Sequence, residues 1–331
     1  MSDQKSKTVL SFILRFGLSG ILLWYLFSKI DLKATIEVLK SADVLWLSAA
    51  GFVFLICNFI ILFRWWVLIR ALDLSVSLAN VIRYYFIGLF GNLFLPSAIG
   101  GDIIKIIGLC KDSSEKPKVV ASVLLDRLSG FASIVIVSVL AFVFGYRLIN
   151  DNSLVMPIII LALGSFMVAG ILFNERLYEF GCRVFNGLPK FKKALMDMHY
   201  DVMLLSSRKK EGFKAIGLSC LSQAFFATSY FCVANALHQD ISFVYFLIFV
   251  PLICVAAAVP SIGGLGVREM GAAYLFAKAG MESGIGASLG LVNFIFMVIV
   301  GLIGGLVYVF TFSSGRVQRD SSDTVIARQK S

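Results

Sequence analysis

Two glycine-rich segments place charged side chains directly after a break in an otherwise apolar stretch. The first contains Gly100, Gly101, Asp102 and Lys105, and the second contains Arg268. A helix that begins after such a break leaves its first backbone N–H groups unpaired and positive, which favours an anion at that end. A cation in the first turn opposes the helix dipole unless an anion or a carboxylate neutralises it. The pattern therefore predicts either a site for an anionic group or structural ion pairs, and both interpretations stay open at this point.

The two segments also resemble each other. Each contains Pro-Ser, then Gly-Gly, then charged residues, and Pro96 and Pro260 are about half of the chain apart. This spacing indicates an internal duplication. Where a helix breaks at membrane depth, the freed backbone N–H and C=O groups must form hydrogen bonds with protein or with water in a cavity. Such breaks therefore indicate where a membrane protein binds a polar group. The candidate substrate-binding residues are Asn92, Ser97, Gly100, Gly101, Asp102 and Lys105 in the first segment, and Ser261, Gly263, Gly264, Arg268 and Glu269 in the second.

Asp126 and Arg127 add a further pair of charges within an apolar run. A charge at the centre of a membrane helix costs about 2.5–3.5 kcal/mol on insertion scales, so both should face the protein interior. Asp126 could neutralise Lys105, and Arg127 could meet Asp102 or a phosphate. We therefore add both to the candidate substrate-binding residues. If the substrate is coupled to protons, Asp126 and Glu269 are the candidate carriers by residue type.

Asp102 and Arg64 also have structural interpretations. Asp102 is expected to be the N-cap of the helix that follows the first break. Arg64 stands next to Trp65 and Trp66, which is typical of an anchor in the aromatic belt at the membrane interface.

The composition is that of a polytopic membrane protein. Hydrophobic residues make up 59% of the 331 residues, charged residues 15%, and the mean hydropathy is +0.89. The net charge of +10 does not require nucleic acid, because the basic residues fall between apolar runs, where they set topology and meet anionic lipid. The six cysteines and two histidines show no paired spacing, so no disulfide, metal or cofactor is expected.

Six apolar runs are long enough to cross a bilayer of about 30 Å. Two more segments, 79–110 and 243–278, are apolar but broken at the glycine-rich motifs, and each half is short for a crossing. We therefore predict an all-α polytopic membrane protein with six transmembrane helices and two re-entrant helical hairpins in an inverted-topology repeat. The predicted spans lie near 9–29, 44–63, 119–146, 154–173, 213–237 and 285–312.

The positions of Lys and Arg favour this topology, because they concentrate in the segments that it places in the cytoplasm. Both termini are then cytoplasmic and the protein is multi-pass in the cytoplasmic (plasma) membrane. The polar end of the chain is predicted to be disordered, and the charged linker is either amphipathic and interfacial or simply solvated. The predicted single membrane domain, 1–331, comprises a first repeat at 44–146, a cytoplasmic amphipathic linker at 174–212, a second repeat at 213–312 and a disordered cytoplasmic tail at 313–331.

At these motifs the chain resembles the membrane region of lysylphosphatidylglycerol synthases, a family that also contains stand-alone flippase-like proteins. In two-part members, the membrane region is proposed to flip aminoacylated phosphatidylglycerol made by a soluble transferase domain. The 331 residues contain no such domain, so aminoacyl transfer is not expected. The matching residues are Asn92, Leu95, Pro96, Ser97, Gly100, Gly101, Asp102, Asp126, Arg127, Pro260, Ser261, Gly263, Gly264, Gly266, Arg268 and Glu269.

The resemblance implies a lipid flippase or transporter that moves an anionic phospholipid or lipid-linked headgroup between leaflets. The alternative is a non-catalytic membrane subunit that presents a lipid or glycolipid to a partner transferase. A lipid-modifying enzyme would need convergent nucleophiles or carboxylates beside the breaks, and the sequence offers too few, so we predict no enzymatic activity. The expected partners are membrane lipids, with a transferase or a second copy of the chain as further candidates.

Overall fold

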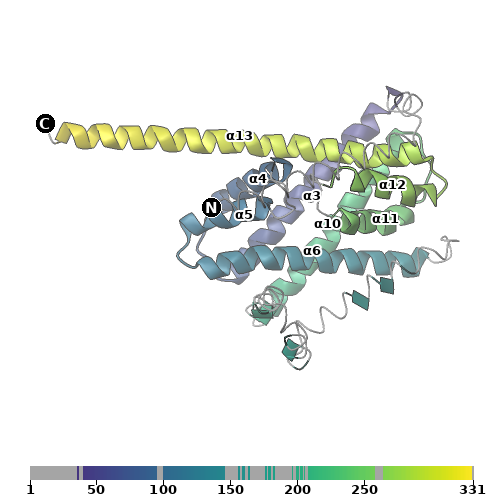
Figure 1. Cartoon of the computed structure of the whole chain (residues 1–331), viewed down its shortest axis with the longest axis horizontal. Coiled ribbons are helices and arrows are strands. Elements are labelled where there is room, and N and C mark those ends of the chain that lie inside the picture. Colours follow the sequence, from purple (N-terminus) through teal and green to yellow (C-terminus); the bar gives the residue numbers. More distant parts are fainter. Residues whose placement is uncertain are drawn as a thin grey trace, which may run out of the picture.

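The computed structural model describes residues 40–94, 100–145, 208–257 and 264–329, together with position 36 and scattered positions between 156 and 205. This part of the chain contains eight helices and no strand (Figure 1), so the predicted all-α membrane class is confirmed. The helices are α3 (Val44–Ala71), α4 (Leu78–Phe94), α5 (Gly100–Asp112), α6 (Lys116–Gly145), α10 (Lys209–Ala236), α11 (Phe243–Ala256), α12 (Val267–Ala277) and α13 (Ser283–Gln329).

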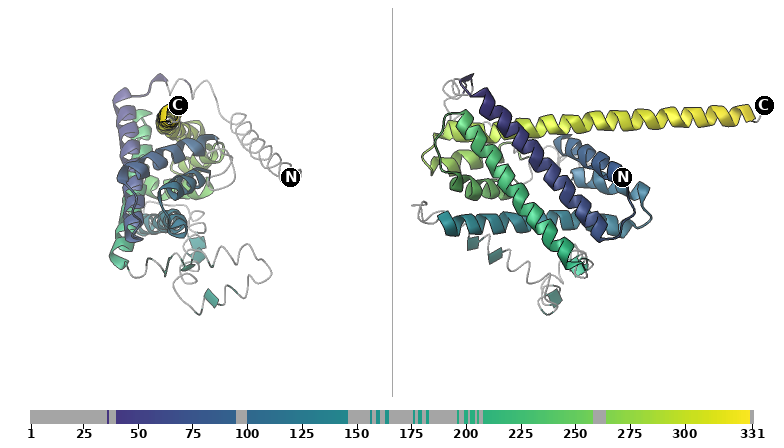
Figure 2. Two further views of the ribbon diagram at one scale, coloured as in Figure 1. Left: turned by 90° about the vertical axis from the view of Figure 1, so that its left-hand side faces the viewer. Right: turned by 180° about the vertical axis from the view of Figure 1, so that it is seen from behind.

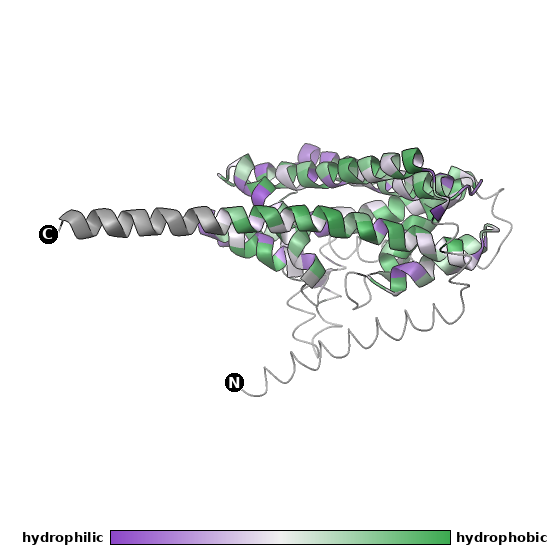
Figure 3. Ribbon diagram, turned by 90° about the horizontal axis from the view of Figure 1, so that it is seen from above, coloured by the Kyte–Doolittle hydropathy of each residue, from purple (hydrophilic) through white to green (hydrophobic). Residues whose placement is uncertain are grey.

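Four of these helices are long and apolar enough to cross a membrane. They are α3, α6, α10 and the Ser283–Thr311 part of α13, and each coincides with a predicted span. The coloured part of α13, the helix that leads to the C-terminus, is mostly hydrophobic in Figure 3. The predicted spans at 9–29 and 154–173, and most of the predicted linker at 174–212, lie outside the described residues.

Helices α3 and α10 lie side by side and antiparallel (Figure 2, right). At one end, the Asp43 N–H donates to the Ala236 carbonyl over 2.9 Å. At the other end, Arg208 Nη2 lies 3.0 Å from Asp73 Oδ2. Asp43 also caps α3, since its carboxylate accepts the backbone N–H of Leu45 at 2.8 Å. The pair therefore forms a long scaffold that is fixed at both ends.

The two broken segments are antiparallel pairs of short helices. In the first pair, Asn80 near the start of α4 donates to Asp112 at the end of α5 over 2.8 Å. In the second pair, the rings of Phe246 and Phe276 lie 4.8 Å apart, which joins the start of α11 to the end of α12. Figure 1 accordingly shows that α5 returns to the end of the molecule from which α4 starts, and that α12 returns likewise toward the start of α11.

Each pair packs against the long helix of the other half of the chain, because α4 contacts α13 and α11 contacts α6. Glycines allow these close approaches: a Cβ on Gly304 would lie 2.0 Å from the Phe86 carbonyl oxygen, and one on Gly145 would lie 2.4 Å from Val244. Close packing through small residues is the usual way that membrane helices associate. The order long, short, short, long thus occurs twice, and the two halves interlock.

The two main clusters of the buried core each combine residues from both halves of the chain. Trp65, Leu68 and Tyr85 belong to the first cluster, and Tyr230 and Phe249 belong to the second. Large apolar side chains also cover the outside of the long helices, as a lipid-facing surface requires.

Helix α13 continues to Gln329, where the sequence predicts a disordered tail from residue 313. The predicted disorder follows from the polarity of this segment, which does not by itself prevent a helix. The segment contains no proline, so the hydrogen-bond ladder that begins in the span is not interrupted.

Candidate functional site

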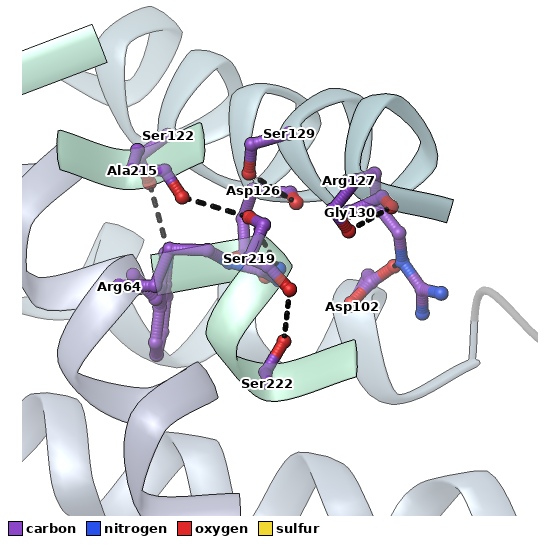
Figure 4. Close-up of polar contacts among 12 residues, drawn as sticks. Arg64, Asp102, Ser122, Asp126, Arg127, Ser129, Gly130, Ala215, Ser219 and Ser222 are labelled. Atoms are coloured by element: carbon purple, nitrogen blue, oxygen red, sulfur yellow. Dashed lines mark hydrogen bonds and ion pairs between the residues drawn. The ribbon is translucent and has the colours of Figure 1, made fainter. Parts of the chain in front are cut away.

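A network of five charged side chains lies where α3, α5 and α6 meet. Figure 4 labels Arg64, Asp102, Asp126 and Arg127 of this network. Arg64 Nε donates to Asp126 Oδ1 over 2.7 Å. Arg127 Nε donates to Asp102 Oδ2 over 2.5 Å. Lys105 Nζ lies between the two carboxylates, 3.5 Å from Asp102 Oδ1 and 4.0 Å from Asp126 Oδ2. Each carboxylate therefore faces two cations, and three cations face two carboxylates.

Four of the five residues are buried, and only the Arg127 side chain is substantially exposed, at 42%. Buried charges are tolerated when they are paired and hydrogen-bonded, because an isolated one costs many kcal/mol to dehydrate. The network satisfies that condition. Its excess positive charge can be compensated at the Arg127 end, where the side chain reaches the surface.

Helix α10 and two aromatic rings complete the surroundings of the network. Arg64 Nη1 donates to Ser219 Oγ over 3.0 Å. The Lys105 ammonium lies 5.0 Å from the Trp65 ring centroid and 5.2 Å from that of Tyr85. These rings stabilise the buried ammonium by cation–π attraction, which replaces part of its lost hydration.

The predicted contacts of Lys105 with Asp126 and of Arg127 with Asp102 are both present. The prediction that Arg64 anchors the interface is wrong, since its side chain is 8% exposed and pairs with Asp126. The neighbouring Trp65 suggested the interface, and no local pattern links Arg64 to a carboxylate 62 positions away. Arg64 is thus a member of the network that sequence reasoning missed.

The prediction that Asp102 is the N-cap of its helix is wrong, because α5 begins at Gly100 and places Asp102 in the first turn. Its carboxylate pairs with Lys105 and Arg127, whose full charges outcompete the backbone N–H groups. The break is bridged instead by Asn92, whose Oδ1 accepts the Gly101 N–H over 2.9 Å. Of the predicted site residues, Ser97, Ser261 and Gly263 lie outside the described residues.

The second motif is built differently. Gly264 and Gly266 have φ values of 83° and 86°, a left-handed conformation that glycine adopts without strain. Glu269 Oε2 accepts the Gly266 N–H over 2.6 Å and so caps α12. Arg268 forms no ion pair among the described residues. Its guanidinium instead contacts a thioether, since Arg268 Nη1 lies 3.9 Å from Met297 Sδ. The structure therefore brings Gly264, Arg268 and Glu269 together at the start of α12.

The two first-turn cations consequently have unequal environments. Lys105 is buried between two carboxylates, whereas Arg268 is only partly buried and has a thioether as its contact. A thioether is a weak acceptor, so it does not compensate a guanidinium. Nearby, Ser229 Oγ donates to Asn293 Oδ1 over 3.0 Å, and the buried Tyr230 hydroxyl has no hydrogen-bond partner. The second motif is thus a polar centre with unused hydrogen-bonding capacity.

A separate cavity of about 290 Å³ lies between the end of α3 and the start of α10. It does not include any residue of the two motifs. Arg70 stacks on the Trp66 ring at 4.5 Å, and Lys214 lies 5.2 Å from the Phe63 ring centroid. Basic and aromatic groups together suit an anionic headgroup with its chains in the bilayer. The lining residues are Phe63, Trp66, Val67, Arg70, Lys210, Glu211 and Lys214.

The fold and the site define a multi-pass α-helical membrane protein with two broken segments and charged groups beside them. The family model for the lysylphosphatidylglycerol synthase transmembrane region matches residues 12–305, so the chain belongs to that family. The chain is also similar to a UPF0104 membrane protein of Pyrococcus horikoshii. The two are 25% identical over 326 residues, which cover 91% of this chain and 96% of the relative.

Proposed function

We propose that the protein is a lipid flippase or transporter of the cytoplasmic membrane. It moves the headgroup of an anionic phospholipid or lipid-linked glycan between leaflets while the chains stay in the bilayer. In this proposal the α4–α5 and α11–α12 pairs are re-entrant hairpins of an inverted repeat, and the spans at 9–29 and 154–173 bring the total to six. Membership of the family, the repeated helix order and the interlocked packing support it.

The observation that carries the proposal is the environment of Arg268. Its guanidinium lies in the first turn of α12 without an ion pair among the described residues, at the end of the helix where N–H groups are also positive. Burying part of a cation at this position costs free energy unless an anion binds beside it. A phosphate or another anionic headgroup provides that charge and accepts a bidentate hydrogen bond from arginine.

The first motif has a different part in this proposal. Because Lys105 is held by Asp102 and Asp126, the network fixes α5 against α6 and supports the first hairpin. The basic cavity between α3 and α10 supports the proposal further, since it would concentrate anionic lipid beside the protein.

The test is leaflet exchange of labelled phosphatidylglycerol in liposomes that contain the purified protein. We expect exchange above that of empty liposomes, and a loss of about tenfold or more in Arg268→Gln, since a charge-assisted hydrogen bond contributes roughly 1.5–3 kcal/mol. Lys278→Gln removes the same charge from the C-cap of the same helix, outside the motif, and should keep the exchange rate. Equal loss in both variants would contradict a headgroup site at Arg268.

The accessory-subunit alternative makes a different prediction for the same preparation. If correctly folded protein moves neither phosphatidylglycerol nor a lipid-linked glycan, the flippase proposal is wrong. A stable complex with a transferase in the native membrane would then support the role of a subunit that presents lipid.

A further inference from the structure

Apart from the charge of Arg268, the surroundings of Glu269 suit a carboxylic acid better than a carboxylate. The residue is 2% exposed, and its Oε1 has no hydrogen-bond partner. Its Oε2 accepts the Gly266 N–H. An ionised carboxylate can accept about four hydrogen bonds and is costly to bury with so few donors. The opposing effect, attraction to the α12 N-terminus, contributes about 2 kcal/mol at most.

The other candidate carrier, Asp126, has the opposite environment. Its Oδ1 accepts from Arg64, and its Oδ2 lies 4.0 Å from the Lys105 ammonium. Asp126 therefore faces two cations at short range, whereas Glu269 has one hydrogen-bond donor and no ion pair among the described residues. The structure thus separates two residues that the sequence could not distinguish.

Few charged or titratable groups face Glu269 from the packed helices. Arg268 is its neighbour on α12, and Tyr230 on α10 lies within electrostatic range of both residues and of Cys254 on α11. Helix α13 presents Gly290, where a Cβ would lie 3.0 Å from the Glu269 Cα. The Ser283–Thr311 part of α13 contains no Asp, Glu, Lys or Arg. Arg268 is therefore the one charge, among the described helices, that can decide the ionisation of Glu269.

We propose that Glu269 is a proton-binding site linked to the anion site at Arg268. With an anionic headgroup on Arg268, the positive field at Glu269 is cancelled and Oε1 carries a proton. After the headgroup leaves, Arg268 attracts the carboxylate and the proton departs. Because linkage is reciprocal, the proton strengthens anion binding by the same factor. The inference rests on the proposed function for its ligand.

The chemistry is a simple proton exchange. Glu269 takes one proton from water to form an O–H bond at Oε1, and it returns that proton to water when the carboxylate forms again. No redox partner is needed. A headgroup that carries one negative charge would then cross the membrane together with one proton, which removes the net charge of the moving pair and its cost in the bilayer.

The test uses infrared difference spectra of the full-length protein in nanodiscs of phosphatidylglycerol, recorded while the pH is stepped. Glu269→Gln is neutral and keeps an acceptor for the Gly266 N–H, so its fold should persist. Glu282→Gln removes an exposed carboxyl nearby and serves as the control. We expect a protonated-carboxyl band at neutral pH that is lost in Glu269→Gln and kept in Glu282→Gln. Identical wild-type and Glu269→Gln spectra would overturn the proposal.

Linkage to the anion is tested in nanodiscs of phosphatidylcholine, which supply no net negative headgroup. The band should lose intensity at neutral pH there, and an unchanged band would overturn the linkage. In liposomes, a pH gradient should accelerate exchange of labelled phosphatidylglycerol by the wild type but not by Glu269→Gln. If no lipid moves in any liposome, the proposed transport fails, whereas the infrared band still decides whether Glu269 holds a proton.

Discussion

The charge network depends on Asp126, because this carboxylate faces both Arg64 and Lys105. It is also the one carboxylate of the network that pairs with Arg64. Asp126→Asn keeps the shape of the side chain but leaves two buried cations short of a counterion. Breaking a buried ion pair from one side typically costs about 3–5 kcal/mol. We therefore expect a marked fall in the thermal unfolding midpoint of the purified protein in detergent.

The matched control is Asp73→Asn, which removes the exposed partner of Arg208 at the end of α3. Exposed pairs contribute roughly 0–1 kcal/mol, so the unfolding midpoint should change little. Similar midpoints for the two variants would show that the network adds no more than a surface ion pair.

At the scale of the helices, the α4–α5 pair depends on glycine. A Cβ on Gly101 would lie 2.2 Å from the Gly88 carbonyl oxygen and 2.6 Å from Asn92 Oδ1, both too close for any real contact. Gly101→Ala should therefore push α5 away from α4, loosen the bond from the Gly101 N–H to Asn92, and lower stability by about 1–3 kcal/mol, the usual cost of overpacking. The unfolding midpoint in detergent measures this.

Gly217→Ala is the matched control for this substitution. Gly217 lies within α10, and a Cβ there would meet nothing within 4 Å. Alanine is the better helix former by about 0.8–1 kcal/mol, so the control should be neutral or stabilising. A fall of equal size in both variants would refute the close approach as the reason for glycine at position 101.

The helices themselves could be predicted because their signals are local. Runs of apolar residues predict α3, α6, α10 and the first part of α13, and the glycine-rich breaks predict the two short pairs. The partners of the charges are a different matter. Arg64 and Asp126 lie 62 positions apart, and Arg64 reaches Ser219 from 155 positions away. Only the packing of α3 against both α6 and α10 brings these side chains together, and no local pattern encodes it.

For the whole molecule, the arrangement of the two pairs predicts the sides of the membrane on which their connections lie. Figure 1 places the junction of α5 and α6 at the opposite end of the molecule from the junction of α12 and α13. With re-entrant hairpins and cytoplasmic termini, Ser114 is cytoplasmic and Glu282 is external. Both residues are exposed, so a cysteine at either position can react with a probe.

The measurement is labelling of Ser114→Cys and Glu282→Cys, each in a variant without the six native cysteines, with a thiol reagent that does not cross membranes. Glu282→Cys should react in intact cells, and Ser114→Cys only after the membrane is permeabilised. If both pairs instead crossed the bilayer once, the basic segment that contains Ser114 would lie outside, and Ser114→Cys would react in intact cells. That result would overturn the re-entrant topology, and with it the inverted repeat on which the proposed function depends.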